Sequence, residues 1–245
     1  MAIINSLNNF RVLQWQKLKN KVHRDREKLF IAEGYHLVTE AHKTKYLKEL
    51  VTTEKNTGFE VPTYQVTYEV MEKLTSLATP TKFLGICHKK EPAAYGNRLL
   101  LLDQIHHPGN LGTIIRSAAA FGIDTVVLDK SVDVCNQKVI QSTQGMVFHV
   151  NVIKGDLGGI IAELKPRGYQ IIGTDVKHGV PLHTMKPHKK HAVLIGNESD
   201  GADSALLGMC DTSVTIKMDD KCESLNAGVA ASIVLYSLSL NFASM

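Results

Sequence analysis

The chain has 245 residues, of which 44% are hydrophobic and 21% charged, and its formal net charge is +4. This composition is typical of a globular protein with one large or two modest domains. There is no apolar run of about eighteen residues and no signal-peptide layout at the start, so we expect a cytoplasmic protein without a membrane span. The four cysteines form no Cys-x-x-Cys pair, which favours reduced thiols over disulfides or a zinc site.

Positive charge is concentrated in the first part of the chain. Residues 1–98 hold 16 Lys and Arg against 10 Asp and Glu, whereas residues 99–245 hold 12 against 14. The basic residues are densest at Lys17, Lys19, Lys21, Arg24 and Arg26. Such a run is either a solvated helix face or a surface for phosphates, whose contacts supply most sequence-independent affinity for nucleic acids.

The first hundred residues predict a small α/β domain. Hydrophobic patterning predicts helices over 9–28, 35–42 and 69–77 and strands over 29–33, 46–53, 63–66 and 83–88. Residues 89–97 are polar, contain Pro and Gly, and separate two apolar strands. We therefore expect a linker there, between one domain at 1–92 and another at 98–245.

The second domain alternates between strands and helices. The pattern predicts strands over 99–103, 125–128, 147–152, 169–174, 192–195 and 213–216, with helices over 110–121 and 139–144, around 160–164, and at the C-terminal end. The run 99–102 is continuously apolar, as in a strand covered on both faces. This alternation predicts an α/β fold with a mostly parallel sheet and helices on both faces.

Three polar stretches each follow a predicted strand. The first, Pro108-Gly109-Asn110-Leu-Gly112-Thr-Ile-Ile-Arg116, opens a helix at the carboxyl edge of the sheet, where α/β proteins place ligands. The second is the loop from Gly196 to Gly201. The third, from Ile216, places Glu223, Ser224 and Asn226 at the start of the closing helix, where main-chain N–H groups can hold a polar ligand. Each stretch taken alone is also an ordinary capped turn, and the dinucleotide-binding fingerprint is absent.

In order and spacing, the three stretches resemble the motifs of the SpoU/TrmH family of RNA ribose 2′-O-methyltransferases, within the knotted SPOUT superfamily. The segment Arg24-x-Arg26-x-x-Leu-Phe-Ile-Ala-Glu33-Gly34 is similar to the family's N-terminal substrate-binding domain, which is related to ribosomal protein L30e. The resemblance covers nearly the whole chain. It implies a deep trefoil knot, S-adenosylmethionine as cofactor, no metal, and a homodimer through the motif-one and closing helices.

The resemblance also implies roles for single residues. The positions that match the family's catalytic or structural polar residues are Asn110, Arg116, Glu198, Ser224 and Asn226. The implied cofactor-binding positions are Thr174, Leu194, Gly196, Gly201, Ile216, Met218, Ser224, Leu225 and Asn226.

The chain departs from the family pattern at several places. His107 stands where Asp is common, Lys217 where Pro is usual, Asp220 where Gly is usual, and Ala227-Gly228 replaces a common Val-Ser. The departures at Lys217 and Asp220 fall in the turn that holds several of the implied cofactor-binding positions.

The implied reaction moves a methyl group to a ribose hydroxyl, which must lose its proton. Arg116 is too basic to accept that proton simply and is better suited to hold phosphate and hydroxyl in line. Water, phosphate or a side chain such as His107 then remains as acceptor, and Glu198 is expected to orient Arg116 or its own loop. His178, His183, His188 and His191 match no common zinc spacing, so we expect a solvent-exposed or RNA-contacting loop instead.

A substrate-binding domain of this kind favours 23S rRNA as the substrate, by analogy with the family. The alternatives are a tRNA 2′-O-methyltransferase of the same family and a non-catalytic RNA- or ribosome-binding protein with the same fold. The residues do not reveal which nucleotide or base is modified.

Overall fold

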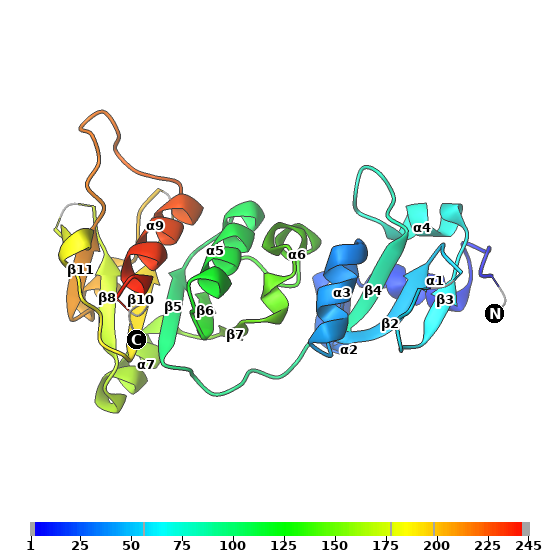
Figure 1. Cartoon of the computed structure of the whole chain (residues 1–245), viewed down its shortest axis with the longest axis horizontal. Helices are drawn as coiled ribbons and strands as arrows, with labels where there is room; N and C mark the ends of the chain where they lie inside the picture. Colours follow the sequence, from blue (N-terminus) through cyan, green and yellow to red (C-terminus); the bar gives the residue numbers. More distant parts are fainter. Residues whose placement is uncertain (1–2, 56, 177, 198, 242–245) are drawn as a thin grey trace. The chain divides into compact units, whose positions relative to one another are not determined.

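The computed structural model describes residues 3–55, 57–176, 178–197 and 199–241. Its contacts divide the chain into two compact units. The N-terminal unit comprises Met1–Glu91 and Asp133–His149, and the C-terminal unit comprises Pro92–Val132 and Val150–Met245. Figure 1 labels the elements of both units in chain order.

The N-terminal unit contains a four-stranded mixed sheet in the order β1-β4-β2-β3. Its strands are β1 (Leu29–Glu33), β2 (Leu47–Thr52), β3 (Thr63–Gln65) and β4 (Phe83–His88), and its helices include α3 (Tyr35–Lys43) and α4 (Tyr68–Leu74). β4 pairs antiparallel with β1 and β2, while β2 and β3 are parallel. Trp15, Ile31, Val51 and Met71 are buried in one cluster with their neighbours. The small α/β architecture agrees with the sequence prediction.

The single helix predicted over 9–28 is wrong, because the chain forms two helices, α1 (Phe10–Lys17) and α2 (Lys21–Glu27). The side chain of Asn20 accepts a hydrogen bond from the backbone N–H of Val22 at 2.8 Å and so caps α2. An Asn at this point starts a new helix more readily than it continues an old one. Periodicity alone did not detect the break, because apolar residues occur on both sides of it.

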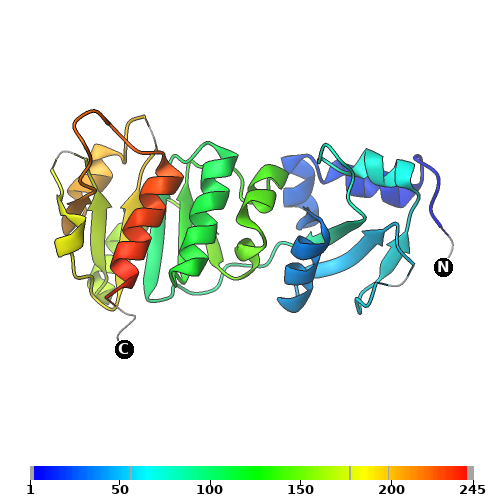
Figure 2. The same ribbon diagram turned by 45° about the horizontal axis from the view of Figure 1, so that its top comes forward.

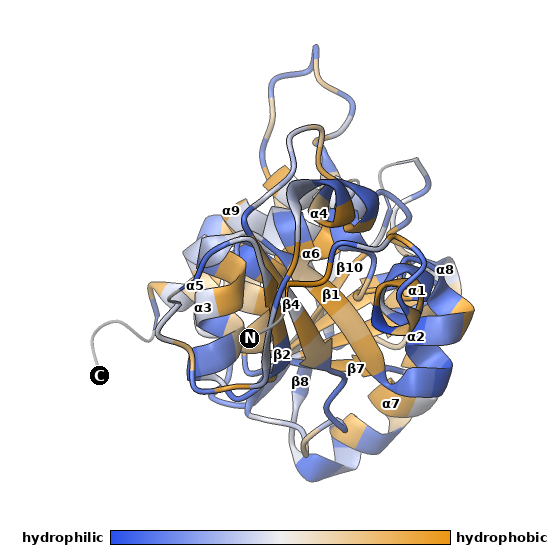
Figure 3. Cartoon of the chain, turned by 90° about the vertical axis from the view of Figure 1, so that its right-hand side faces the viewer, coloured by the Kyte–Doolittle hydropathy of each residue, from blue (hydrophilic) through white to orange (hydrophobic). Residues whose placement is uncertain are grey.

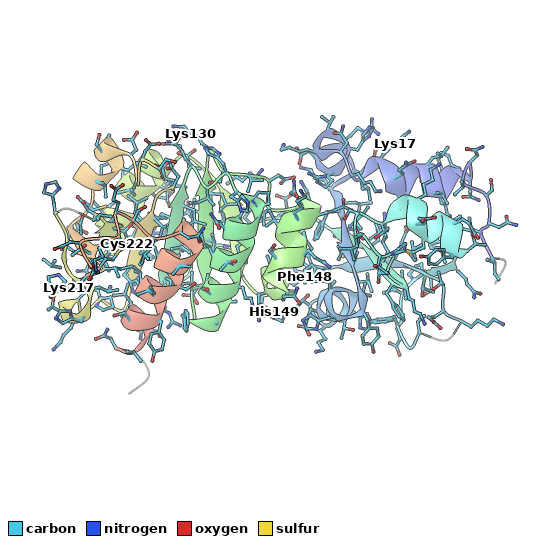
Figure 4. The ribbon with its side chains drawn as sticks, turned by 90° about the horizontal axis from the view of Figure 1, so that it is seen from above. Lys17, Lys130, Phe148, His149, Lys217 and Cys222 are labelled. Carbon is cyan, nitrogen blue, oxygen red and sulfur yellow. The ribbon has the colours of Figure 1, made fainter. Side chains whose placement is uncertain are left out.

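Residues 133–149 pack on the N-terminal unit, although a boundary at 89–97 assigns them to the second domain. The segment forms α6 (Gln137–Thr143) and the 3-10 helix η1 (Met146–Phe148). The Phe148 ring lies 6.2 Å from that of Phe30 and 5.2 Å from that of Tyr46, measured between centroids; Figure 4 labels Phe148 and His149. The strand predicted over 147–152 is therefore largely wrong, and β7 occupies Asn151–Lys154. A short apolar run is equally typical of a buried helical turn and of a strand.

The C-terminal unit has a seven-stranded sheet in the order β7-β6-β5-β10-β8-β11-β9, in which neighbouring strands are parallel. The strands not yet given are β5 (Arg98–Asp103), β6 (Thr125–Asp129), β8 (Gln170–Thr174), β9 (Val180–Pro181), β10 (His191–Ile195) and β11 (Thr212–Thr215). The helical elements are α5 (Pro108–Ala120), α7 (Leu157–Leu164), η2 (Lys165–Arg167), η3 (Leu182–Thr184), α8 (Ser204–Gly208) and α9 (Ala227–Ser239). The α/β prediction with a parallel sheet is confirmed, while β9 and α8 had not been predicted.

Helices cover both faces of this sheet, which explains why its central strands are apolar throughout. Leu99 and Leu101 of β5 are buried with Ile161 and Leu164 of α7. The alternate residues Leu100 and Leu102 are also fully buried and point to the opposite face. On that face α5 and α9 lie side by side (Figure 2). The buried residues of β5 therefore pack against the helices on both faces of the sheet.

Hydrophobic residues are concentrated in the strands, and hydrophilic residues in the helices and loops around them. Figure 3 shows strands such as β1 and β4 in apolar colours, with hydrophilic colours mainly on the surrounding helices and loops. Within the described ranges, no helix combines the length and the apolar character needed to cross a membrane.

Candidate active site

The first polar stretch lies at the carboxyl end of β5 and opens α5. Pro108 occupies the first turn of α5, where its missing N–H costs no helical hydrogen bond. Asn110 follows in the same turn, and its side-chain oxygen accepts a hydrogen bond from the side-chain amide of Asn226 at 3.0 Å. Asn226 is the N-cap of α9 and accepts from the backbone N–H of Gly228 at 2.9 Å. The structure thus joins two predicted site residues that are 116 positions apart in the sequence.

The contact between α5 and α9 continues along both helices. Ser117 and Ser232 are joined by a hydrogen bond of 2.7 Å between their hydroxyl oxygens. Near the other end, the rings of Phe121 and Tyr236 lie 5.6 Å apart. The small residues Gly228 and Ser232 of α9 let the two helices approach closely, since a Cβ at Gly228 would lie only 3.2 Å from the Thr113 side chain.

The second polar stretch forms a tight loop after β10. Asn197 and Gly201 exchange two backbone hydrogen bonds of 3.2 Å, and the Asn197 side chain accepts from the N–H groups of Ser199 and Asp200. A Cβ at Gly196 would lie 2.0 Å from the backbone nitrogen of Ala202, so this close approach requires glycine. Glu198 lies outside the described residues, and its predicted role stays a prediction.

A buried carboxylate at the end of β5 accepts a hydrogen bond from the segment that follows the loop from Gly196 to Gly201. Asp103, the last residue of β5, is 1% exposed, and its carboxylate accepts a hydrogen bond from the backbone N–H of Asp203 at 2.9 Å. Asp203 in turn caps α8. The sequence reasoning had not singled out Asp103, because an Asp at a strand end is common.

A pocket of about 420 Å³ lies between the ends of β8, β10 and β11 and the start of α9. Seven of the nine predicted cofactor-binding residues line it: Thr174, Gly196, Gly201, Ile216, Met218, Ser224 and Leu225. The volume lies within the range of about 300–1,000 Å³ for small-molecule sites. Ile216 and Met218 lie in the loop beyond β11 rather than at a strand end, because β11 stops at Thr215. Figure 4 labels Lys217 and Cys222 on the same loop.

Two predicted cofactor-binding residues do not line the pocket. Leu194 is fully buried in the core, and its carbonyl accepts the hydroxyl hydrogen bond of Thr174 at 2.9 Å. Asn226 instead holds the start of α9 against Asn110. Leu194 therefore holds the lining residue Thr174, and Asn226 holds the helix that follows the lining residue Leu225.

Further residues line the pocket, and of these only Glu223 had been singled out in the sequence. Carboxylates come from Asp175, Asp200 and Glu223, and apolar walls from Val176, Val214, Ala230 and Val234. The combination suits a ligand with an apolar ring and a positive charge. The signal for Asp175 was available, since it directly follows the predicted strand end at Thr174. That Ala230 and Val234 of α9 line the pocket depends on where this helix packs, which the sequence pattern does not show.

Arg116 lies away from this pocket within the same chain. It is exposed on α5, does not line the pocket, and has no hydrogen bond or ion pair within the parts of the chain that the structure describes. α9 presents Ala230 and Val234 to the pocket and Ser232 to α5. Because these residues lie on different faces of the helix, α9 separates Arg116 from the pocket.

The basic run of the N-terminal unit serves partly structural purposes. Arg24 is 4% exposed and donates hydrogen bonds to the carbonyls of Leu18 and Lys19. It also forms an ion pair with the Asp133 carboxylate, with 2.8 Å between Nη2 and Oδ2. These contacts give the buried Arg24 guanidinium a structural role, and its RNA-binding role stays a prediction. Lys19 donates to the carbonyls of Lys73 and Thr75.

Lys19 and the other three basic residues remain at the surface. Lys21 pairs with Asp25, and Arg26 pairs with Glu27 at 2.8 Å. The hydrogen bonds from Lys21 and Lys89 hold the pKa of the Asp25 carboxyl well below its usual range. Lys17 is exposed and forms no interaction within the described ranges.

The histidine-rich loop does not gather into a metal site among the described residues. His178 approaches Asp175, with 3.3 Å between Nδ1 and Oδ2. His191 is instead 2% exposed, and its Nδ1 lies 2.8 Å from the His188 carbonyl oxygen. Burial lowers the pKa of His191, so this residue belongs to the core and not to a solvent-exposed loop.

Comparison with known proteins identifies the class to which this arrangement belongs. Residues 97–236 match the SpoU rRNA methylase family, and residues 9–85 match the MRM3-like substrate-binding domain. The chain belongs to the SpoU rRNA methylase family.

Particular relatives resemble almost the full length of the chain. It is 36% identical over 97% of its length to the 23S rRNA (guanosine(2553)-2′-O)-methyltransferase RlmP of Bacillus subtilis, covering 99% of that protein. It also matches an S-adenosylmethionine-bound rRNA methyltransferase from Sinorhizobium meliloti, with 27% identity, a TM-score of 0.86 and 97% of each chain covered. The fold of AviRb from Streptomyces viridochromogenes is similar as well, with 24% identity, a TM-score of 0.84, and coverage of 97% of this chain and 99% of that one.

Proposed function

We propose that this chain transfers a methyl group from S-adenosylmethionine to the ribose 2′-hydroxyl of a nucleotide in large-subunit rRNA. The observation that carries the proposal is the pocket, which gathers residues of the second and third polar stretches beside the Asn110–Asn226 contact. The similarity to RlmP extends across both units and favours an rRNA substrate over tRNA. It also favours an enzyme over a non-catalytic RNA-binding protein.

The proposed division of labour follows the sequence domains. Residues 1–92 bind RNA, with Lys17, Lys19, Lys21 and Arg26 as exposed cations, and residues 98–245 carry the methyl transfer. An rRNA substrate also favours the cytoplasmic location expected from the sequence.

The pocket residues are suited to hold the cofactor, which supplies an electrophilic methyl group on a positively charged sulfur. The backbone of the loop from Gly196 to Gly201 and the turn at Ser224 and Leu225 offer main-chain donors and acceptors to it. The carboxylates of Asp175 and Glu223 are placed to attract its positive charge.

Arg116 is proposed to hold the substrate phosphate and ribose in line with the methyl group. A guanidinium remains protonated and offers a planar fork of donors, so it orients an anion better than it accepts a proton. His107 precedes α5, is exposed, and folds against Gly109. A ring nitrogen of histidine can act as a general base, so His107 is our candidate acceptor for the hydroxyl proton.

We further propose that the active enzyme is a homodimer built on α5 and α9. Val229, Ile233, Tyr236 and Leu240 form an exposed apolar stripe along α9, each 38–53% exposed. A stripe of this kind on a regular helix is typical of an interface. Since α9 separates Arg116 from the pocket of its own chain, the site is completed by Arg116 of a second copy. The order β5-β10-β8-β11 and the return of α9 to the side of α5 support the trefoil knot implied by the family.

The test is methyl transfer by the purified chain from labelled S-adenosylmethionine to large-subunit rRNA and to tRNA, followed by mapping of the modified ribose. We expect labelling of a 2′-oxygen in the large-subunit rRNA alone. Calorimetry should detect S-adenosylmethionine but not NAD. Tight binding of NAD with no response to S-adenosylmethionine would overturn the proposal.

A further inference from the structure

The N-terminal unit carries an aromatic cluster that its core does not require. The cluster consists of Tyr35, His42, Phe59 and Phe83. The Tyr35 ring lies 5.1 Å from Phe83 and 6.0 Å from Phe59, and His42 lies 5.3 Å from Phe59. These rings come from α3, from the loop between β2 and β3, and from the start of β4.

The backbone holds Tyr35 firmly beside Phe83. Gly34 turns the chain from β1 into α3 with a φ of 102°, which only glycine adopts readily. Its N–H donates to the Phe83 carbonyl at 2.9 Å, and the Thr52 hydroxyl donates to the Lys82 carbonyl at 2.8 Å. Tyr35 is therefore the first residue of a helix whose start is anchored to the sheet.

Tyr35 nevertheless remains open to solvent. Its exposed fraction is 59%, whereas Trp15 and Phe30 in the same unit are only 4% and 3% exposed. Both neighbouring rings meet Tyr35 at steep angles of 66° and 70°. Within the described parts of the chain, no aromatic ring stacks face to face on Tyr35. A planar aromatic group can therefore stack on the exposed face of the Tyr35 ring, whose position the backbone fixes.

We propose that the aromatic cluster is a stacking site for an unpaired base of the RNA substrate, with Tyr35 as the stacking residue. The inference rests on the proposed function. The match to a substrate-binding domain covers residues 9–85 and so includes all four rings. Unpaired RNA bases are recognised chiefly by stacking on aromatic side chains, and every base offers such a face.

The charge around the cluster agrees with RNA as the partner. Residues 1–98 hold the whole positive excess of the chain. Lys82, directly before Phe83, has a side chain that is 72% exposed and pairs with Glu54 at 2.8 Å. A base stacked on Tyr35 would bring its phosphate near the Lys82 ammonium, which could exchange Glu54 for the phosphate.

The experiment measures binding of the full chain to one mixed-sequence RNA oligonucleotide, single-stranded and annealed as a duplex. Tyr35→Ala should weaken binding of the single strand by roughly 5- to 150-fold, as expected for loss of one base stack. Tyr35→Phe should bind as the wild type does, because it keeps the ring. Duplex binding should change much less in either variant.

Tyr68→Ala provides a matched control. Tyr68 also begins a helix of the N-terminal unit, is 56% exposed, and has no aromatic contact among the described residues. Its replacement should leave single-strand binding unchanged. Equal effects of Tyr35→Ala and Tyr68→Ala would overturn the proposal, as would equal losses for single strand and duplex.

A spectroscopic readout separates stacking from general loss of structure. An oligonucleotide that contains 2-aminopurine should be quenched by the wild type and by Tyr35→Phe but not by Tyr35→Ala. Quenching that persists in Tyr35→Ala at saturating protein would show that the base stacks elsewhere. Methyl transfer is assayed separately. If the wild type stacks RNA on Tyr35 but transfers no methyl group, the proposed function fails while this inference stands.

Discussion

The two units use their polar residues in opposite ways. In the C-terminal unit, the polar residues that stand out in the sequence lie at the ends of parallel strands, and most of them surround one pocket. In the N-terminal unit, charged residues such as Arg24 and Glu33 are buried and hold the fold together. A parallel sheet directs its loops to one edge, so motif residues there are free to bind a ligand. A small mixed sheet has a small core, and some of its charges become structural.

The largest effect should come from Arg116→Ala, which tests whether the exposed arginine of the C-terminal unit is functional. Loss of the phosphate-orienting fork should lower single-turnover methyl transfer by about a hundredfold or more. Affinity for S-adenosylmethionine should stay unchanged, because Arg116 does not line the pocket. Arg116→Lys should recover little, since an ammonium is a point charge. Wild-type rates in Arg116→Ala would mean that Arg116 is an ordinary surface residue.

Gly196→Ala tests how tightly the pocket loop is built. The added Cβ would collide with backbone atoms of Gly201 and Ala202, which cannot move aside as a side chain can. Overpacking costs about 1–3 kcal/mol, so calorimetry should show S-adenosylmethionine binding weakened roughly 5- to 150-fold. The control is Gly208→Ala, because a Cβ at Gly208 meets no atom within 4 Å. Equal affinities in the two variants would contradict the close approach at Gly196.

Arg24→Ala tests the structural use of charge in the N-terminal unit. The variant removes the guanidinium from the Asp133 carboxylate, and breaking a buried ion pair costs about 3–5 kcal/mol of unfolding free energy. Arg26→Ala, at an exposed position, should change it by less than about 0.5 kcal/mol. The double variant Arg24→Met/Asp133→Leu should recover part of the loss in denaturant unfolding. If Arg24→Ala instead weakens RNA binding without loss of stability, Arg24 acts in RNA binding and not in holding the fold.

The smallest effect concerns pH and His191. Burial lowers the pKa of His191 in the folded chain, so the unfolded chain binds a proton at higher pH than the folded chain does. The stability contributed by the neutral imidazole is thus present above the unfolded pKa of about 6.5 and is lost as pH falls through the lower folded pKa. His191→Asn can keep a donor toward the His188 carbonyl but does not titrate. Unfolding free energies measured from pH 8 downward should fall less steeply in the variant, and parallel curves would contradict the assignment.

Much of the fold was predictable because the spacing of apolar residues along the chain is a local feature that indicates helices and strands. The apolar run at 99–102 predicted a strand covered on both faces, and β4 occupies the predicted residues 83–88. The prediction failed where a long-range partner decided the structure. The segment around Phe148 reads as a strand by itself but becomes a helical turn in the core of the N-terminal unit.

The sequence by itself indicated the class of protein, because three polar stretches, each after a predicted strand, resemble the motifs of the SpoU/TrmH family in order and spacing. It also located most of the pocket, since glycines and strand ends are local features. Only the tertiary structure decided which side chains meet. The Asn110–Asn226 contact, the burial of Arg24 against Asp133, and the exposure of Tyr35 all depend on residues far apart in the chain. Burial and contact are properties of packed surfaces, and packing brings distant segments together in ways that local patterns do not encode.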